Sequence, residues 1–194
     1  LSGKLIRHVD PAGHSIRTEY SDGRLQAVYR TADGVTERFD YEYIPKGDNK
    51  GRLQYITYTR NSPLLRVEYT YYGTTSPNGN LGDLESARTA FRDSGEWKHR
   101  DNAIHYYRYY KYGIGTYCQG LLKYVVGPQA FHAIAVDRKT NPFLASDNTI
   151  KSHADIALTY YEDAGYRSRR VETITLQGGV RRHVFKYSLK QASR

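Results

Sequence analysis

The chain has 194 residues, 39% of them hydrophobic, and a formal net charge of +9 from 29 basic and 20 acidic residues. No apolar run approaches the roughly 20 residues of a membrane-spanning helix. The single cysteine, Cys118, excludes an internal disulfide and a thiolate metal cluster. The aromatic residues are 20 Tyr, five Phe and one Trp, and tyrosine favours the half-buried face of a pleated sheet. This composition favours a wide sheet over a thick apolar core.

The chain opens with strand patterns separated by tight turns. Residue types alternate between polar and apolar with the period of two that is typical of strands. The turns contain glycine, aspartate or proline, as in Asp10-Pro11-Ala12-Gly13 and Ser21-Asp22-Gly23. Four strands are predicted here: Leu5 to Val9, Ser15 to Tyr20, Arg24 to Arg30 and Val35 to Ile44.

A repeat of 28 residues follows from these patterns. The tetrapeptide Gly23-Arg24-Leu25-Gln26 returns unchanged from Gly51 to Gln54, and a degenerate copy begins at Gly79. The tyrosine strand from Phe39 to Tyr43 likewise precedes the strand from Val67 to Tyr71 by 28 residues. A fixed period of this size indicates a chain built by stacking one supersecondary unit.

The second half of the chain continues the pattern around a helical insertion. A hairpin is predicted from Leu84 to His105 with its turn at Asp93-Ser94-Gly95, and a further strand pair from Ile104 to Val126. Pro128 suits the first position of a helix that ends by Asn141-Pro142, and Ser146 suits the N-cap of a second short helix. Strands then resume at Ile156. The predicted organisation is residues 1–126 as repeat hairpins, 127–155 as the insertion and 156–194 as further hairpins.

The segment from Asp10 to Gly13, the strand that ends at Tyr20, and the run from Ser21 to Leu25 together resemble the YD repeat of RHS proteins. A second, looser match begins at Tyr161. The likeness covers nearly the whole chain apart from the helical insertion. The glycines expected in the turns of the repeats are Gly13, Gly23, Gly51, Gly79, Gly120 and Gly165.

The resemblance implies an all-β fold, a long antiparallel sheet of hairpins that spirals into a shell. It implies a structural role in a secreted or cell-surface protein, as the wall of a shell around a toxin or other cargo, or as an extracellular filament. The partners it implies are neighbouring repeats of the same or identical chains and an enclosed polypeptide. The chain, which contains no methionine, is expected to be a segment of a longer polypeptide. No enzyme activity, catalytic residue or cofactor is implied.

One stretch carries an alternative function. The candidate binding surface consists of Tyr106, Tyr107, Arg108, Tyr109, Tyr110 and Tyr112. As a strand it places Tyr106, Arg108 and Tyr110 on one face, and alternating rings and bases could stack on sugars or bind another polyanion. The competing interpretation is a structural tyrosine ladder with arginine stems over the rings. Glycans therefore stay open as a partner, and nucleic acid is not expected.

Other candidate chemistry is weak. The seven histidines show no metal-ligand spacing, and Cys118 has no nearby histidine, so an inert thiol is expected. The turn residues Asp22, Asp48 and Asp163 match no calcium loop. Residues 167–194 contain eight bases and a single acid, Glu172. This excess indicates either a polyanion surface or a strand face whose acids lie in a neighbouring segment.

Overall fold

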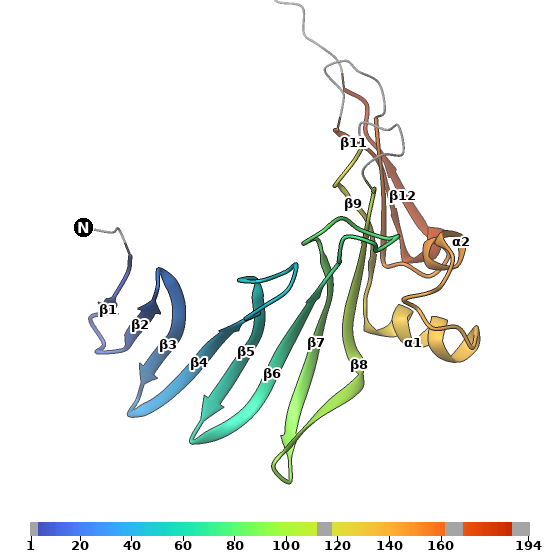
Figure 1. Cartoon of the computed structure of the whole chain (residues 1–194). Helices are drawn as coiled ribbons and strands as arrows, with labels where there is room; N and C mark the ends of the chain where they lie inside the picture. Colours follow the sequence, from blue (N-terminus) through green and yellow to red (C-terminus); the bar gives the residue numbers. More distant parts are fainter. Residues whose placement is uncertain (1–3, 112–117, 162–168, 188–194) are drawn as a thin grey trace, which may run out of the picture. The chain divides into compact units, whose positions relative to one another are not determined.

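The structure, a computed structural model, describes residues 4–111, 118–161 and 169–187. Its strands form one 12-stranded sheet in which every strand lies beside its neighbours in the sequence (Figure 1). The described pairings are all antiparallel. This architecture confirms the predicted all-β fold, an antiparallel sheet with a small helical insertion.

The elements have the following bounds: β1 (Arg7–Val9), β2 (Ser15–Ser21), β3 (Arg24–Ala32), β4 (Val35–Tyr43), β5 (Leu53–Arg60), β6 (Ser62–Tyr71), β7 (Leu84–Asp93), β8 (Glu96–Tyr109), β9 (Leu122–Val126), α1 (Pro128–Asp137), α2 (Asp147–Lys151), β10 (Ile156–Tyr160), β11 (Val171–Leu176), the short 3-10 helix η1 (Gln177–Gly179) and β12 (Arg181–Val184). The strands expected from Glu96 to His105 and from Ile104 onward are one continuous strand, β8, which runs through Asp101 and Asn102 without a turn.

The helical insertion follows the predicted signals at its start. Pro128 is the first residue of α1, and the Ser146 side chain caps α2 by accepting the Thr149 N–H. However, α1 ends at Asp137 rather than at Asn141-Pro142. Lys139 has a φ of 48°, which a right-handed helix does not accommodate.

Three loops of the sheet close with the same pair of backbone hydrogen bonds. In the first, the Ile44 N–H donates to Arg52 O, and the Gly51 N–H donates to Ile44 O. The loops from Tyr72 to Asp83 and from Tyr110 to Leu121 repeat both bonds at equivalent positions. The repeat is thus present in the hydrogen bonding as well as in the sequence.

Four hairpins of the sheet carry a β-bulge beside a tyrosine at or next to the end of their first strand. The register shifts lie at equivalent places: Glu19/Tyr20, Glu42/Tyr43, Arg108/Tyr109 and Thr159/Tyr160. A bulge adds one residue to the partner strand and increases its local twist. The tyrosine then lies opposite a leucine or valine that opens the partner strand.

The same tyrosines bond to the preceding hairpin. The Tyr43 hydroxyl donates to Leu25 O at 2.8 Å, and the Tyr160 hydroxyl donates to Leu122 O at 2.9 Å. Leu25 and Leu122 are themselves the residues opposite Tyr20 and Tyr109. We call this contact the interhairpin tyrosine bond. In these two hairpins it ties the hairpin to the one before it at the same point of the repeat.

The chain divides into two compact units, of which the first comprises Leu1–Thr70 and Ala87–Ala103. Its described residues form strands and turns without a helix. The strand register separates two faces. One, the charged face, carries Arg17, Glu19, Tyr29, Arg38, Asp40, Glu42, Tyr55, Arg66 and Glu68. The other, the apolar face, carries Ile16, Val28, Phe39, Ile56, Tyr58, Leu65 and Val67, together with one ion pair between Arg30 and Glu37 near the ends of β3 and β4.

The charged face is a lattice of rings and ion pairs. Arg17 and Arg38 lie over the two sides of the Tyr29 ring, at 4.1 and 5.3 Å from its centroid. Arg66 contacts the rings of Tyr55 and Trp97 at 4.5 and 4.4 Å. These long side chains cover the backbone between them, so that a small residue such as Ala27 is only 1% exposed.

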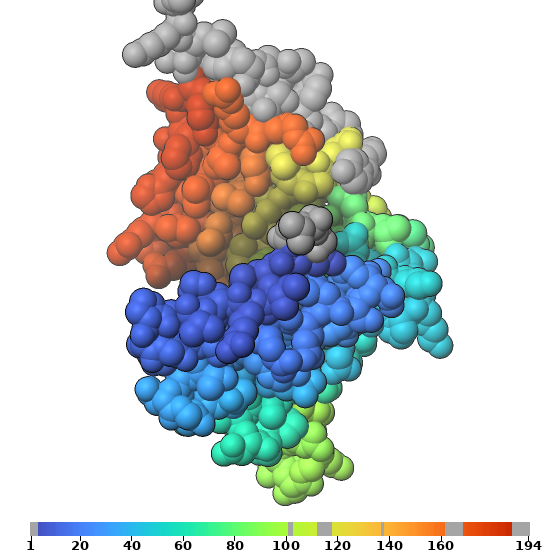
Figure 2. All heavy atoms as spheres, turned by 90° about the vertical axis from the view of Figure 1, so that its left-hand side faces the viewer, coloured from blue at the N-terminus to red at the C-terminus, as the bar shows by residue number. Residues whose placement is uncertain are grey.

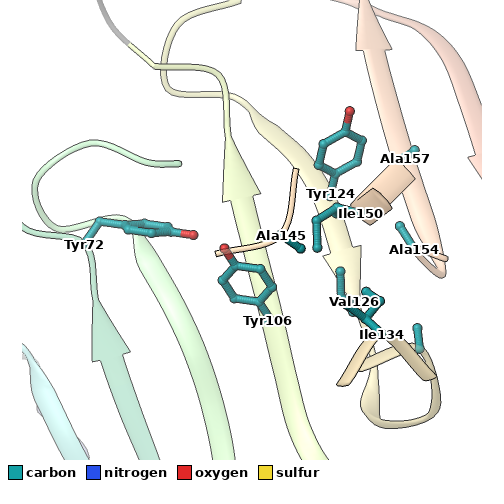
Figure 3. Close-up of a cluster of buried hydrophobic side chains, with 10 residues drawn as sticks. Tyr72, Tyr106, Tyr124, Val126, Ile134, Ala145, Ile150, Ala154 and Ala157 are labelled. Carbon is teal, nitrogen blue, oxygen red and sulfur yellow. The ribbon is translucent and has the colours of Figure 1, made fainter. Parts of the chain in front are cut away.

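The second unit comprises Tyr71–Ser86 and Ile104–Arg194 and holds the hydrophobic core. Its core residues are Tyr72, Tyr106, Tyr124, Val126, Ala130, Ile134, Ala145, Ile150, Ala154 and Ala157 (Figure 3). The two helices supply three of them and the strands β8 to β10 most of the rest. The helical insertion therefore covers one face of these strands.

Candidate functional site

Arg108, near the end of β8, is the centre of the predicted tyrosine and arginine stretch. Its side chain is only 2% exposed. The guanidinium donates to Asp147 Oδ1 at 2.9 Å, to Pro142 O at 3.2 Å and to Ala145 O at 2.7 Å. Its Nε donates to the Tyr106 hydroxyl at 2.9 Å. A single buried cation thus satisfies the backbone carbonyls of the loop between α1 and α2.

Tyr106 lies on the same face and is fully buried. Its ring meets those of Phe131 and Phe143 edge to face, with centroids at 6.3 and 5.0 Å. The Tyr72 hydroxyl points toward the Tyr106 hydroxyl (Figure 3) and donates to Tyr107 O at 2.6 Å. Burial, followed by the neighbouring Tyr106 hydroxyl, raises the pKa of Tyr72 far above the ordinary tyrosine value. This face of β8 is therefore interior.

The remaining tyrosines of the candidate surface are partly buried. The Tyr109 ring lies edge to face against Tyr72 at 6.3 Å, and burial raises the pKa of Tyr109 to about 12. The Tyr110 ring meets Tyr160 at 5.9 Å, and its hydroxyl donates to Leu158 O. Tyr107 is half-buried. Tyr112 lies outside the described residues.

The stretch thus contributes mainly to packing. The predicted alternation holds for Tyr106 and Arg108, but these two side chains face the insertion rather than solvent. Their burial favours the structural tyrosine ladder over a stacking surface for sugars or bases.

A cavity of about 210 Å³ lies at the end of this strand. It is lined by Pro77, Asn78, Arg108, Tyr109, Tyr110, Lys111, Lys123 and Asp147. Its lining includes three basic side chains and one acidic side chain, and each of the three bases already has a hydrogen-bond or ion-pair partner in the protein. Lys111 donates to Ser76 O at 2.5 Å, and Lys123 pairs with Asp147.

Asp147 is the electrostatic partner of the cavity's bases. Burial by itself raises the pKa of this carboxyl, but hydrogen bonds from Lys123 and Arg108 and their positive charges outweigh it. The net result is a pKa below the ordinary aspartate value. Asp147 is therefore ionised at neutral pH and acts as a counter-ion, not as a general acid.

The predicted turn glycines fall into three groups. Gly13, Gly23, Gly51 and Gly120 have positive φ, as tight turns require. Gly79 does not. In its loop the positive φ belongs to Gly82, which makes the bond equivalent to that of Gly51. The loop is thus three residues longer than the 28-residue period predicts. Gly165 lies outside the described residues.

The other candidate residues form no metal-binding group within the described ranges. No three His, Cys, Asp or Glu side chains gather there in a way that could hold a metal ion. His99 pairs with Glu68 at 2.7 Å, and the Cys118 thiol is 1% exposed. Asp22 has a φ of 49°, typical of a turn residue. Asp163 lies outside the described residues. No described helix is both long and apolar enough to cross a membrane.

A second hollow, on the first unit, was not predicted. It measures about 570 Å³ and is lined by Ser21, Asp22, Arg24, Gln26, Tyr41, Glu42 and Tyr43. The Arg24 guanidinium lies over the Tyr43 ring at 5.4 Å. The verbatim repeat of Gly23 to Gln26 marks this place in the sequence, but its concavity depends on the register of β3 and β4.

Sequence reasoning also missed Asp147 and Tyr72 as partners of the β8 stretch. Asp147 directly follows the expected N-cap Ser146 and is 39 residues from Arg108. Tyr72 stands in a loop 35 residues before Tyr107. No local pattern connects positions so far apart.

Comparison with known proteins assigns no family. No protein-family model matches the chain, and a search of curated proteins finds no match.

Proposed function

We propose that the chain is a structural segment of a secreted or cell-surface protein of the RHS/YD-repeat type. In this proposal its sheet is part of a wall, either of a shell that encloses a toxin or other cargo, or of an extracellular filament. The interhairpin tyrosine bond is the observation that carries the proposal. It recurs at equivalent positions in both compact units, from Tyr43 to Leu25 and from Tyr160 to Leu122. A contact that repeats with the hairpin suits a sheet that grows by adding hairpins.

The two faces of the first unit support a wall. Its charged face is saturated with ion pairs and cation–π contacts, which suits water. Its apolar face leaves Ile16 and Leu65 about two-fifths exposed, at 40% and 41%. A wall that separates solvent from an enclosed polypeptide needs this asymmetry.

Electron microscopy of the native assembly that contains this chain tests the proposal, at a resolution that traces strands. Sheet that continues past both β1 and β12 around a hollow particle is the result expected of a shell. A periodic fibre would support the filament. A compact particle in which β1 and β12 have no neighbouring strand would overturn the wall.

The hollow on the first unit favours glycan binding as a second candidate function. Its carboxylates, amide and tyrosine rings are the groups that bind sugar hydroxyls and stack on sugar rings. A glycan array with the wild-type chain and the Glu42→Gln variant tests it. Glu37→Gln is the matched control, because Glu37 and Glu42 each pair with an arginine but only Glu42 lines the hollow. Signals lost only in Glu42→Gln support binding, and an array without signals overturns it.

A further inference from the structure

The last strand, β12, has a backbone edge that faces away from the sheet. Among the described strands, β12 comes last in the sheet and lies beside β11 alone. The Phe185 N–H, just beyond the strand, donates to Glu172 O at 2.8 Å, toward β11. Successive residues of an antiparallel strand direct their backbone groups to opposite sides. Arg182 and Val184 therefore direct theirs outward, where another strand would pair.

The side chains of this edge are basic and exposed. Arg181, Arg182 and Lys186 are all exposed, and none of them forms an ion pair with an acid among the described residues. Figure 2 shows the red-orange atoms of this hairpin at the surface of their unit. Within the described ranges, β11 therefore supplies no carboxylate that pairs with Arg181, Arg182 or Lys186.

The inner strands of the first unit show how this sheet neutralises its bases. Arg30 on β3 pairs with Glu37 on β4, and Arg66 on β6 pairs with Glu42. His99 on β8 pairs with Glu68 on β6. Carboxylates on other strands are thus one way in which this sheet neutralises bases, beside pairs within one strand such as Arg17 with Glu19 and Arg38 with Asp40. Since β12 carries no acid of its own, an acidic neighbouring strand would complement its bases.

A second copy of this chain does not supply such a strand. The opposite edge, β1, carries Arg7 and His8, and all of its residues are exposed. Pairing β12 with β1 of another copy, or with a second β12, would place bases against bases. Like charges on directly opposed strands are destabilising.

We propose that β12 is extended by an acidic strand: an extended segment of a neighbouring repeat with Asp or Glu at alternate positions. The backbone of Arg182 and Val184 pairs with this segment, and its carboxylates, all on one face of the strand, neutralise Arg182 and Lys186, whose positions share a face. This inference rests on the proposed wall continuing past β12, and it adds the chemistry of the strand that continues it.

Binding of labelled peptides to the 194-residue chain tests the inference. A peptide of about eight residues that alternates Thr and Glu is compared with Thr/Gln and Thr/Lys peptides by fluorescence anisotropy. We expect the Thr/Glu peptide to bind at least about tenfold more tightly than the Thr/Gln peptide. The Arg182→Glu/Lys186→Glu double variant is expected to reverse the preference in favour of the Thr/Lys peptide.

Two substitutions of one residue separate strand pairing from simple charge attraction. Val184→Pro removes the outward N–H and should weaken binding of the Thr/Glu peptide about tenfold. Val184→Ala keeps the N–H and should bind as the wild type does. Equal binding by the proline variant, or a chain that forms dimers by itself in sedimentation, would overturn the acidic strand.

The outcome is independent of the test of the wall. If the peptides do not bind but microscopy shows sheet continuing past β12, the proposed wall is supported and the proposed acidic strand is wrong. If the Thr/Glu peptide binds through Val184 but the native particle has no strand beside β12, the wall fails. The edge then remains a binding site for an acidic segment.

Discussion

Arg108 is buried because the chain around it supplies acceptors on every side. Its guanidinium donates to three carbonyls of the loop between α1 and α2, to the Asp147 carboxylate and to the Tyr106 hydroxyl. Burying a charge costs free energy unless hydrogen bonds and a counter-ion compensate for it. Here the compensation also holds the insertion on the sheet, so the residue joins two elements that no sequence pattern connects.

Replacing Arg108 should therefore destabilise the protein strongly. Arg108→Met keeps the side-chain volume but removes the donor to Ala145 O and leaves Pro142 O with the Ala145 N–H at 3.4 Å, and we expect a loss of about 3 kcal/mol in the free energy of unfolding. Urea denaturation followed by circular dichroism measures it. Arg38→Met is the control, since Arg38 is 48% exposed and pairs with Asp40 at the surface, which predicts a loss below about 1 kcal/mol. Similar losses for both variants would refute the anchoring role of Arg108.

Asp147 predicts a dependence of stability on pH. The pKa of its carboxyl is lowered in the folded protein, so the folded state binds this proton less readily than the unfolded chain. The stability it contributes is present above its unfolded pKa, about 3.9, and is lost as the pH falls through the folded pKa. The wild type should thus exceed Asp147→Asn in the free energy of unfolding at about pH 7, and the gap should close near pH 2 to 3. A gap of constant size across this range would contradict the assignment.

At the scale of elements, the loop between β6 and β7 shows how the repeat changes without losing its closure. The backbone bonds that close the loop from Ile44 to Arg52 recur from Tyr72 to Asp83. The additional residues bring Gly79 against the ring of Tyr72, where a Cβ atom would lie 2.1 Å from the ring. Glycine is thus needed at position 79 because there is no room for a side chain. At position 51 it is needed because the backbone of the turn has a positive φ.

Gly79→Ala should therefore destabilise the second unit. Tyr72 is 2% exposed and cannot move aside freely, so we expect a loss of about 2 kcal/mol from overpacking. Thermal unfolding monitored by calorimetry detects it. Gly73→Ala in the same loop is the matched control, because its nearest contact would be Ser76 Oγ at 4.0 Å, and it should change stability by less than about 0.5 kcal/mol. The packing role fails if both alanines are tolerated equally.

At the scale of the whole molecule, the two units differ in what stabilises them. The described part of the first unit is a single layer of strands whose most buried residues are Ala27 and Ala90. The second unit adds two helices and a contiguous core that includes Ile134 and Ile150. Burial of apolar side chains is the larger source of stability.

Amide hydrogen exchange should reveal this difference. We expect amides of β9 and β10, beside the core, to exchange at least about tenfold more slowly than those of β2 and β3. Exchange followed by mass spectrometry on peptic peptides measures both regions in one sample. Equal protection of the two regions would mean that the unit without helices is stabilised by contacts other than apolar burial.

Much of the local structure followed from the sequence. Period-two alternation and turn residues predicted strands such as β2, β3 and β4, because both signals act over neighbouring residues. Pro128 and Ser146 predicted the starts of both helices, since an N-cap depends only on the next three residues. The end of α1 was misplaced, because the φ of Lys139 is not encoded in a recognisable turn motif.

The sequence by itself determined the all-β repeat and the place of its insertion, since strands, turns and caps are specified by adjacent side chains. Only the tertiary structure decided which face of β8 is interior. The alternation placed Tyr106 and Arg108 together but could not tell which side the insertion covers. That choice depends on Asp147 and on the carbonyls of Pro142 and Ala145, which lie 34 to 39 residues away. Backbone acceptors have no sequence signature, so a pattern that resembles a binding surface became the anchor of the core.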